Sequence, residues 1–151
     1  MHTLEFVAAL FWLAFCFAKV EIAIEGRHGW AESLPTWRLP ATHWASRIFF
    51  GGRPATGYHV WLQLFMLSVF HLPYLLSPVR LATELEILAF FVLFWVIEDF
   101  LWFVLNPEFG LRKFTKANIP WHPHWWLFAP SEYFVFAVIG VVLYVAAERM
   151  A

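Results

Sequence analysis

The chain has 151 residues, of which 62% are hydrophobic, 21% are aromatic and only 14% are charged. Its mean hydropathy is +0.64 and its formal net charge is −1. This balance excludes an ordinary soluble domain and is typical of an integral membrane protein. The ten Lys and Arg residues are scattered along the chain, so we expect no nucleic-acid partner.

Four apolar runs are long enough to predict membrane-spanning helices. A helix needs about 20 mostly apolar residues to cross the bilayer core, where backbone polar groups must be satisfied within the segment. Pro73 is expected to kink or end the second helix. The sequence therefore predicts one domain over residues 1–151, an all-α integral membrane protein with a four-transmembrane-helix bundle. The predicted spans cover residues 4–24, 58–76, 85–105 and 131–147.

Polar side chains gather toward the end of the first predicted helix. Glu21, Glu25 and His28 recur at i, i+4 and i+7, on one helix face, provided that Gly26 does not end the helix first. Glu25 and His28 also have the Glu-x-x-His spacing with which ferritin-like bundles direct a carboxylate and an imidazole at one metal. A solvated helix end accounts for the same two residues.

The two longer connections predict the orientation of the chain. The first is rich in Trp, Pro and Gly, so we expect re-entrant or surface-lying turns and short helices there, with the Trp rings at the lipid headgroups. By the positive-inside rule we expect both Trp-rich interfacial loops in the cytoplasm and both termini outside, in a plasma or inner membrane. Only Arg80 and Arg149 lie on the other side. The basic residues of the two loops are Arg27, Arg38, Arg47, Arg53, Arg112, Lys113 and Lys116.

The third predicted helix carries two adjacent carboxylates. Glu98 and Asp99 lie about two turns inside its cytoplasmic end, roughly 10 Å into the apolar layer. A charge at the helix centre costs roughly 2.5–3.5 kcal/mol on insertion scales. Lys19, at a comparable depth on the first helix, would form a purely structural pair with one of them. One lysine leaves a carboxylate over, so the alternative is a functional site with Glu98 and Asp99 as catalytic residues.

The segment "PWHPHWW" at residues 120–126 adds two histidines to the same membrane side. Pro123 favours an extended conformation at His122. Side chains at i and i+2 of an extended segment point to one side, so both His122 and His124 would reach the carboxylates. The alternative is that the three tryptophans of this segment anchor the loop at the headgroups and the histidines only accompany them.

These side chains predict a metal site. Carboxylates and imidazoles are ligands that one or two ions of iron, zinc or manganese accept. The first hypothesis is a small membrane metalloenzyme, an oxidoreductase or hydrolase, that uses metal-activated oxygen or water on a lipid-like, quinone or isoprenoid substrate. Membrane lipids and a hydrophobic small molecule are its expected partners. The predicted ligands are Glu21, Glu25, His28, Glu98, Asp99, His122 and His124.

Two other classes of function stay open. The ten Trp and eighteen Phe residues would suit a homo-oligomer, or a non-catalytic or cofactor-binding subunit of a larger membrane complex. A membrane histidine such as His71 would ligate a haem or a chlorin pigment, and a haem site held by two histidines would need another on a facing helix. Ion or proton transport would use Glu21, Glu98, Asp99 and Lys19 as a path through the bundle. The sequence lacks the histidine boxes of membrane desaturases and the H-E-x-x-H of zinc proteases.

Overall fold

Three helices of the chain are long and apolar enough to cross a membrane. The computed structural model describes residues 3–150. The long helices are α1 (Thr3–Glu25), α4 (Leu81–Leu105) and α6 (Ser131–Met150). They confirm the predicted helices at residues 4–24, 85–105 and 131–147, with one to four further residues at individual ends.

The second predicted span, residues 58–76, is not one continuous helix. α3 (Gly57–Phe70) has 14 residues and a 3-10 helix, η1 (Leu72–Leu75), follows it. His71 caps α3 by donating its backbone N–H to the carbonyls of Leu67 and Ser68. Pro73 lies in the first turn of η1, and it cannot continue α3 because it has no backbone N–H to donate to an α-helical hydrogen bond. The prediction that the helix ends near Pro73 is therefore confirmed, but the α-helix alone is shorter than the predicted span.

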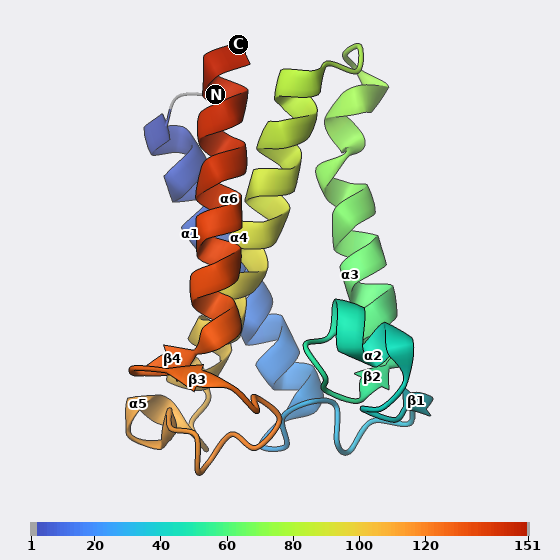
Figure 1. The fold of residues 1–151 in the computed structure, drawn as a ribbon, viewed down its shortest axis with the longest axis vertical. Coiled ribbons are helices and arrows are strands. Elements are labelled where there is room, and N and C mark those ends of the chain that lie inside the picture. The colour runs from blue at the N-terminus through green and yellow to red at the C-terminus, as the bar shows by residue number, and fades with distance from the viewer. Residues whose placement is uncertain (1–2, 151) are drawn as a thin grey trace.

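α4 is the central helix of the molecule. It packs along α6 and α1 and contacts α3 less (Figure 1). Gly140 of α6 permits a close approach to α4, because a Cβ built at this position would lie 2.5 Å from Cγ of Leu93.

One face of α1 is buried along the whole helix, and its side chains change from apolar at the start to acidic at the end. The stripe begins with Phe6 and Leu10, continues through the fully buried Ala14 and Ala18, and ends with two carboxylates. Successive members are three or four residues apart, as one helix face requires. The packing that holds α1 against α4 therefore also carries Glu21 and Glu25 into the interior.

The short elements of the two long connections lie at the end of the bundle opposite to the start of α1 and the end of α6 (Figure 1). The first long connection contains α2 (Trp44–Phe49), as the prediction of short helices expected. β1 (Arg38–Leu39) pairs antiparallel with β2 (Ala55–Thr56). The second connection contains α5 (Gly110–Lys113), β3 (Trp125–Trp126) and β4 (Ala129–Pro130), with β3 paired to β4. The sequence did not predict these two-residue ladders.

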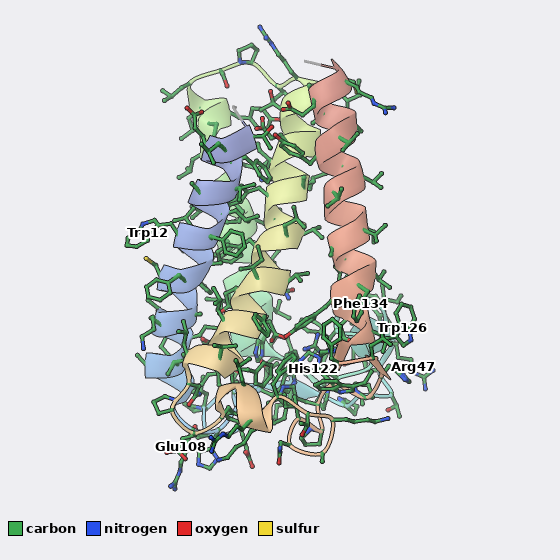
Figure 2. All side chains as sticks on the ribbon, turned by 90° about the vertical axis from the view of Figure 1, so that its left-hand side faces the viewer. Trp12, Arg47, Glu108, His122, Trp126 and Phe134 are labelled. Carbon is green, nitrogen blue, oxygen red and sulfur yellow. The ribbon has the colours of Figure 1, made fainter. Side chains whose placement is uncertain are left out.

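Large apolar side chains cover the outside of the helices. Trp12 on α1 is 65% exposed and points away from the bundle (Figure 2). At the loop end, Leu127 and Phe128 form the turn between β3 and β4 and are also exposed. A surface of this kind is costly in water and suits a lipid environment.

Candidate functional site

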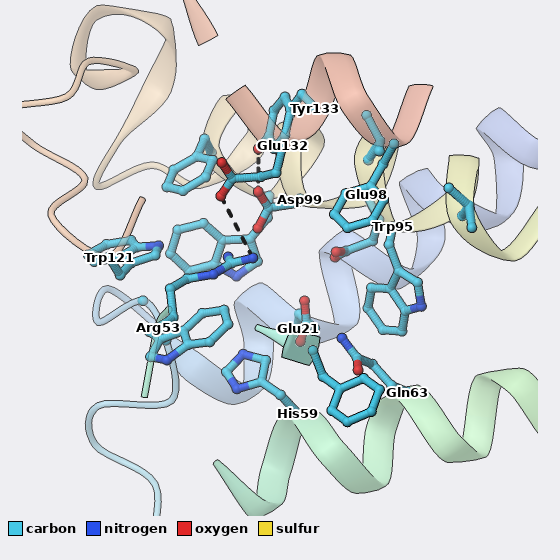
Figure 3. Close-up of a pocket in the computed structure, with 18 of the residues that line it drawn as sticks. Glu21, Arg53, His59, Gln63, Trp95, Glu98, Asp99, Trp121, Glu132 and Tyr133 are labelled. Atoms are coloured by element: carbon cyan, nitrogen blue, oxygen red, sulfur yellow. Dashed lines mark hydrogen bonds and ion pairs between the residues drawn. The ribbon is translucent and has the colours of Figure 1, made fainter. Parts of the chain in front are cut away.

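A cavity of about 340 Å³ lies between the loop ends of the helices. Residues of α1, α2, α3, α4 and α6 line it, together with the connections at this end (Figure 3). Ile48 and Phe49 of α2 and Phe136 of α6 belong to the lining and are themselves exposed. The cavity therefore opens between α2 and α6 through an apolar rim.

His122 is the centre of a polar cluster on one side of this cavity. Its side chain is fully buried. Its Nδ1 lies 2.7 Å from Oε1 of Glu132, and its Nε2 lies 3.2 Å from Oδ2 of Asp99. Tyr133 donates its hydroxyl hydrogen to the same Asp99 oxygen. The first turn of α6 is thereby tied to the last third of α4.

Arg53 completes the cluster from the first long connection. Its Nη2 lies 3.9 Å from Oε1 of Glu132, and its guanidinium stands 4.3 Å above the ring of Trp30. Its Nη1 is also 3.4 Å from Nε2 of His122. Arg53 and His122 are therefore held against two carboxylates, Asp99 and Glu132.

His122 is an imidazolium over a wider pH range than an ordinary histidine. Burial by itself lowers the pKa of His122, but the Asp99 carboxylate and the hydrogen bonds to Asp99 and Glu132 outweigh it and raise the pKa above 6.5. With His122 protonated, two positive charges face two negative ones and the cluster is neutral. A buried group of charges needs such matching.

Glu25 lies outside the His122 cluster and has contacts of its own. Its Oε1 accepts the backbone N–H of Ala31 at 2.5 Å and lies 3.7 Å from Nε2 of His59. Trp30 and Ala31 adopt φ values of 59° and 52°, a left-handed conformation that is uncommon for residues other than glycine. This turn aims the Ala31 N–H back at the end of α1. Trp30 stacks on the His59 ring at 4.1 Å.

Glu21 and Glu98 form the third polar position. Their side chains are 6% and 2% exposed, and both line the cavity. Within the described residues, Oε1 of each has no hydrogen-bond partner. The same holds there for the indole nitrogens of Trp95 and Trp102, which also line the cavity. Buried polar atoms without partners are rare, so each calls for an explanation.

Lys19 does not provide the structural pairing that the sequence suggested. It is exposed, whereas Glu21 belongs to the buried stripe of α1. Glu98 lies on the buried face of α4, and Asp99 pairs with His122. Among residues 3–150, the structure shows no ion pair between Lys19 and either carboxylate.

The structure brings together only part of the predicted metal-ligand set. Glu21, Glu25, Glu98 and Asp99 line the cavity, and His122 contacts Asp99 from beside it. Both ring nitrogens of His122 already face carboxylates. Over residues 3–150, no group of three or more His, Cys, Asp or Glu side chains is placed to hold a metal ion. The metal site stays a prediction without support from this geometry.

His28 does not extend the carboxylate face of α1. The helix ends at Glu25, because Gly26 has φ +68°, the left-handed conformation that glycine accepts at helix ends. His28 then lies on the surface, 3.4 Å from Glu32. The condition attached to the sequence prediction, that Gly26 not end the helix, is not met.

His124 does not join His122. The chain turns at His122, whose backbone N–H donates to the carbonyl of Ile119 at 3.2 Å, and His124 is exposed. Its carbonyl accepts the backbone N–H of Ser131 at 2.9 Å. In "PWHPHWW" one histidine is therefore buried among charges and the other lies at the surface.

Five polar residues of the site were not predicted as members: Arg53, His59, Gln63, Glu132 and Tyr133. From the sequence, Arg53 was used only as one of the basic residues that predict a cytoplasmic loop. Glu132 had a usable signal, because an acidic residue directly after Ser131 favours the start of a helix. The contacts themselves join residues far apart, such as Tyr133 with Asp99 at a separation of 34, so no local pattern reveals them.

The fold and the site define a mostly helical protein of the membrane type, with a carboxylate-rich cavity at one end of its helices. Comparisons with protein-family models, curated proteins and solved structures found no match.

Proposed function

We propose that this protein binds the polar end of a lipid-like molecule in the cavity and acts on it by acid–base chemistry. One observation carries the proposal: the cavity joins an apolar rim to buried polar atoms that lack partners in the described chain. Small-molecule sites combine a largely apolar lining with a few convergent polar groups in this way.

The apolar part of the cavity suits a chain that enters from the bilayer. Phe91 and Val92 of α4 line it toward the middle of the helix, and Phe136 of α6 is exposed at its rim. A hydrocarbon chain would lie along these side chains and leave its polar end near Glu98. The lipid, quinone and isoprenoid classes all have this shape.

Glu21 and Glu98 are the candidates for proton transfer. Ionisable side chains inside a membrane protein are expensive and in general serve a function. Burial and neighbouring groups can tune a carboxyl group so that it gains and loses a proton near the operating pH, as a general acid or base must. Asp99, the other carboxylate predicted as catalytic, is engaged by His122 and Tyr133 and would position rather than react.

A four-span arrangement belongs to the same proposal. α3 and η1 together would form the fourth crossing, because the connection that follows them lies at the far end from α2 (Figure 1). With the basic loops in the cytoplasm, the cavity would sit at the cytoplasmic boundary of a plasma or inner membrane, and both termini would lie outside.

Photolabelling tests the binding function. A long-chain alcohol bearing a diazirine is added to the full chain in maltoside micelles. The sample is irradiated, and the labelled residues are mapped by mass spectrometry. We expect label on Phe91 and Phe136, displaced by unlabelled alcohol in excess. Label on lipid-facing Trp12 should resist displacement, because ordinary detergent contacts do not saturate.

A cavity-filling variant tests whether the displaceable label depends on the cavity. Val96→Trp adds bulk inside the cavity, since Val96 is part of the lining. The displaceable label should fall severalfold in this variant. The matched control is Val138→Trp on the exposed side of α6, which should leave it unchanged. Equal, non-displaceable labelling of all three proteins would contradict the proposal.

A further inference from the structure

Glu21 and Glu98 are the acidic pair of the cavity that lacks a positive partner among residues 3–150. Both are more than nine-tenths buried, and one oxygen of each makes no hydrogen bond there. Both line the cavity, and Figure 3 shows their carboxyl groups directed into the same space. In a low-dielectric site, carboxylates attract a cation far more strongly than they do in water.

The other carboxyl groups around the cavity already have partners. His122 and Arg53 face Asp99 and Glu132 at 2.7–3.9 Å. Glu25 is satisfied by the Ala31 N–H and lies beside His59. Arg53 is additionally held over Trp30. An incoming anion would therefore meet no free positive group in the described part of the site, whereas an incoming cation would meet two carboxyl groups that have no basic partner there and one free oxygen each.

Aromatic rings flank the unmatched pair. Trp95 and Trp102 line the cavity together with Glu21 and Glu98. Figure 3 places Trp95 beside Glu98, on the side of the cavity away from Arg53. The faces of indole rings attract ammonium groups by cation–π interaction, more strongly where water is excluded. Carboxylates combined with such rings select a positively charged group over a neutral one of the same size.

We infer that the cavity takes a cationic amphiphile, an apolar chain that ends in an amine or quaternary ammonium group, with the cation held by Glu21 and Glu98. The inference rests on the proposed function and names the chemistry of the polar end. A neutral headgroup would leave the carboxyl pair without compensation for its burial.

Two water-soluble probes of similar size test the inference. Octyltrimethylammonium carries a positive charge, and N,N-dimethyloctanamide is neutral. Binding of each to the full chain in maltoside micelles is measured by calorimetry and tryptophan fluorescence, with empty micelles as the blank. We expect saturable, stoichiometric binding of the ammonium probe and binding of the amide that is weaker by at least about tenfold.

Charge-neutralising variants locate the interaction. Glu21→Gln and Glu98→Gln keep the shape of the side chain. Each should weaken binding of the ammonium probe by about tenfold or more and have little effect on binding of the amide. Glu108→Gln is the matched control, because Glu108 is exposed and lies outside the cavity lining. It should change neither affinity.

The outcomes separate the two proposals. Equal affinity of the wild-type protein for both probes overturns the cationic inference and leaves the binding function in place. Failure of both probes to saturate also overturns the inference, and the photolabelling experiment then decides separately on the binding function. The wild-type comparison stands even where a glutamine variant does not fold.

Discussion

His122 connects three distant parts of the chain through charge rather than through apolar packing. It contacts Asp99 on α4, Glu132 on α6 and Arg53 in the first long connection. Removing one partner from a buried set leaves the others uncompensated. We therefore expect this residue to matter for stability as well as for the shape of the cavity wall.

The His122→Ala variant should lose about 3 kcal/mol of unfolding free energy, the cost of breaking a buried ion pair. The measurement is unfolding of the purified protein in micelles, followed by circular dichroism. His124→Ala is the control, because His124 is exposed and its loss should cost less than about 0.5 kcal/mol. Similar losses in the two variants would contradict the role given to His122.

The stability of the wild-type protein should also depend on pH through this residue. The pKa of His122 is raised in the folded state above the ordinary 6.5, so the stabilisation is complete below about 6.5 and is lost as the pH rises through the folded pKa. Melting temperatures across this window should fall for the wild type and for His124→Ala. In His122→Ala that decrease should be absent or clearly smaller, and an unchanged decrease would assign it to another group.

Single residues of the site were predictable where a charged side chain lies within an apolar helix, because burying its charge costs free energy. Glu21, Glu98 and Asp99 stood out because carboxylates inside an apolar helix need a reason, and all three line the cavity. His59 and Arg53 did not stand out, because their importance comes from contacts such as Arg53 with His122, 69 residues apart. His28 was misplaced by a single backbone angle at Gly26.

At the scale of elements, α4 and α6 make the most extensive helix–helix contact among the described residues. Gly140 lets the two backbones approach, and a side chain at this position would collide with Leu93. Close approach through small residues replaces the hydrophobic driving force that helices lack inside lipid. Because Glu132 and Tyr133 are carried by α6, this contact also positions one wall of the cavity.

A Gly140→Val variant should destabilise the protein by about 2 kcal/mol, because overpacking forces the helices apart. We expect weaker photolabelling of Phe136 in the same protein, since α6 would move relative to α4. Val138→Leu adds bulk on the exposed side of the same helix and serves as the control. A stable Gly140→Val protein would show that the α4–α6 contact tolerates separation.

Element lengths were only partly predictable. Runs of apolar residues set α1, α4 and α6 correctly, because length and hydropathy decide whether a helix can span a bilayer. The division of the second run into α3 and η1 depends on the cap at His71 and on Pro73. The short ladders β1–β2 and β3–β4 join two-residue strands, which are too short for an alternating pattern to appear.

At the scale of the whole molecule, both Trp-rich connections lie at one end and the connection between α3 and α4 lies at the other (Figure 1). Their positions relative to a membrane are tested by cysteine labelling. Cys16 is the chain's single cysteine, so Cys16→Ala gives a background without thiols. Ser33→Cys and Ser77→Cys then place one exposed thiol at each end.

A membrane-impermeant maleimide should label Ser77→Cys in intact cells and Ser33→Cys only after permeabilisation. This result is expected if α3 and η1 cross the bilayer with the basic loops inside. Labelling of both positions from the same side would show that this segment does not cross. Labelling of Ser33→Cys alone in intact cells would reverse the orientation.

The unequal lengths of α3 and α4 have a consequence for the surrounding lipid. α3 has 14 residues and α4 has 25, about 21 Å and about 38 Å at 1.5 Å per residue. A bilayer core is about 30 Å thick, so α4 is long for it and α3 is short. Lipids beside α3 would thin or α4 would tilt, at a cost that grows with every ångström of mismatch. If α3 and η1 cross the bilayer, the membrane would be thinner on the α3 side of the molecule than beside α4.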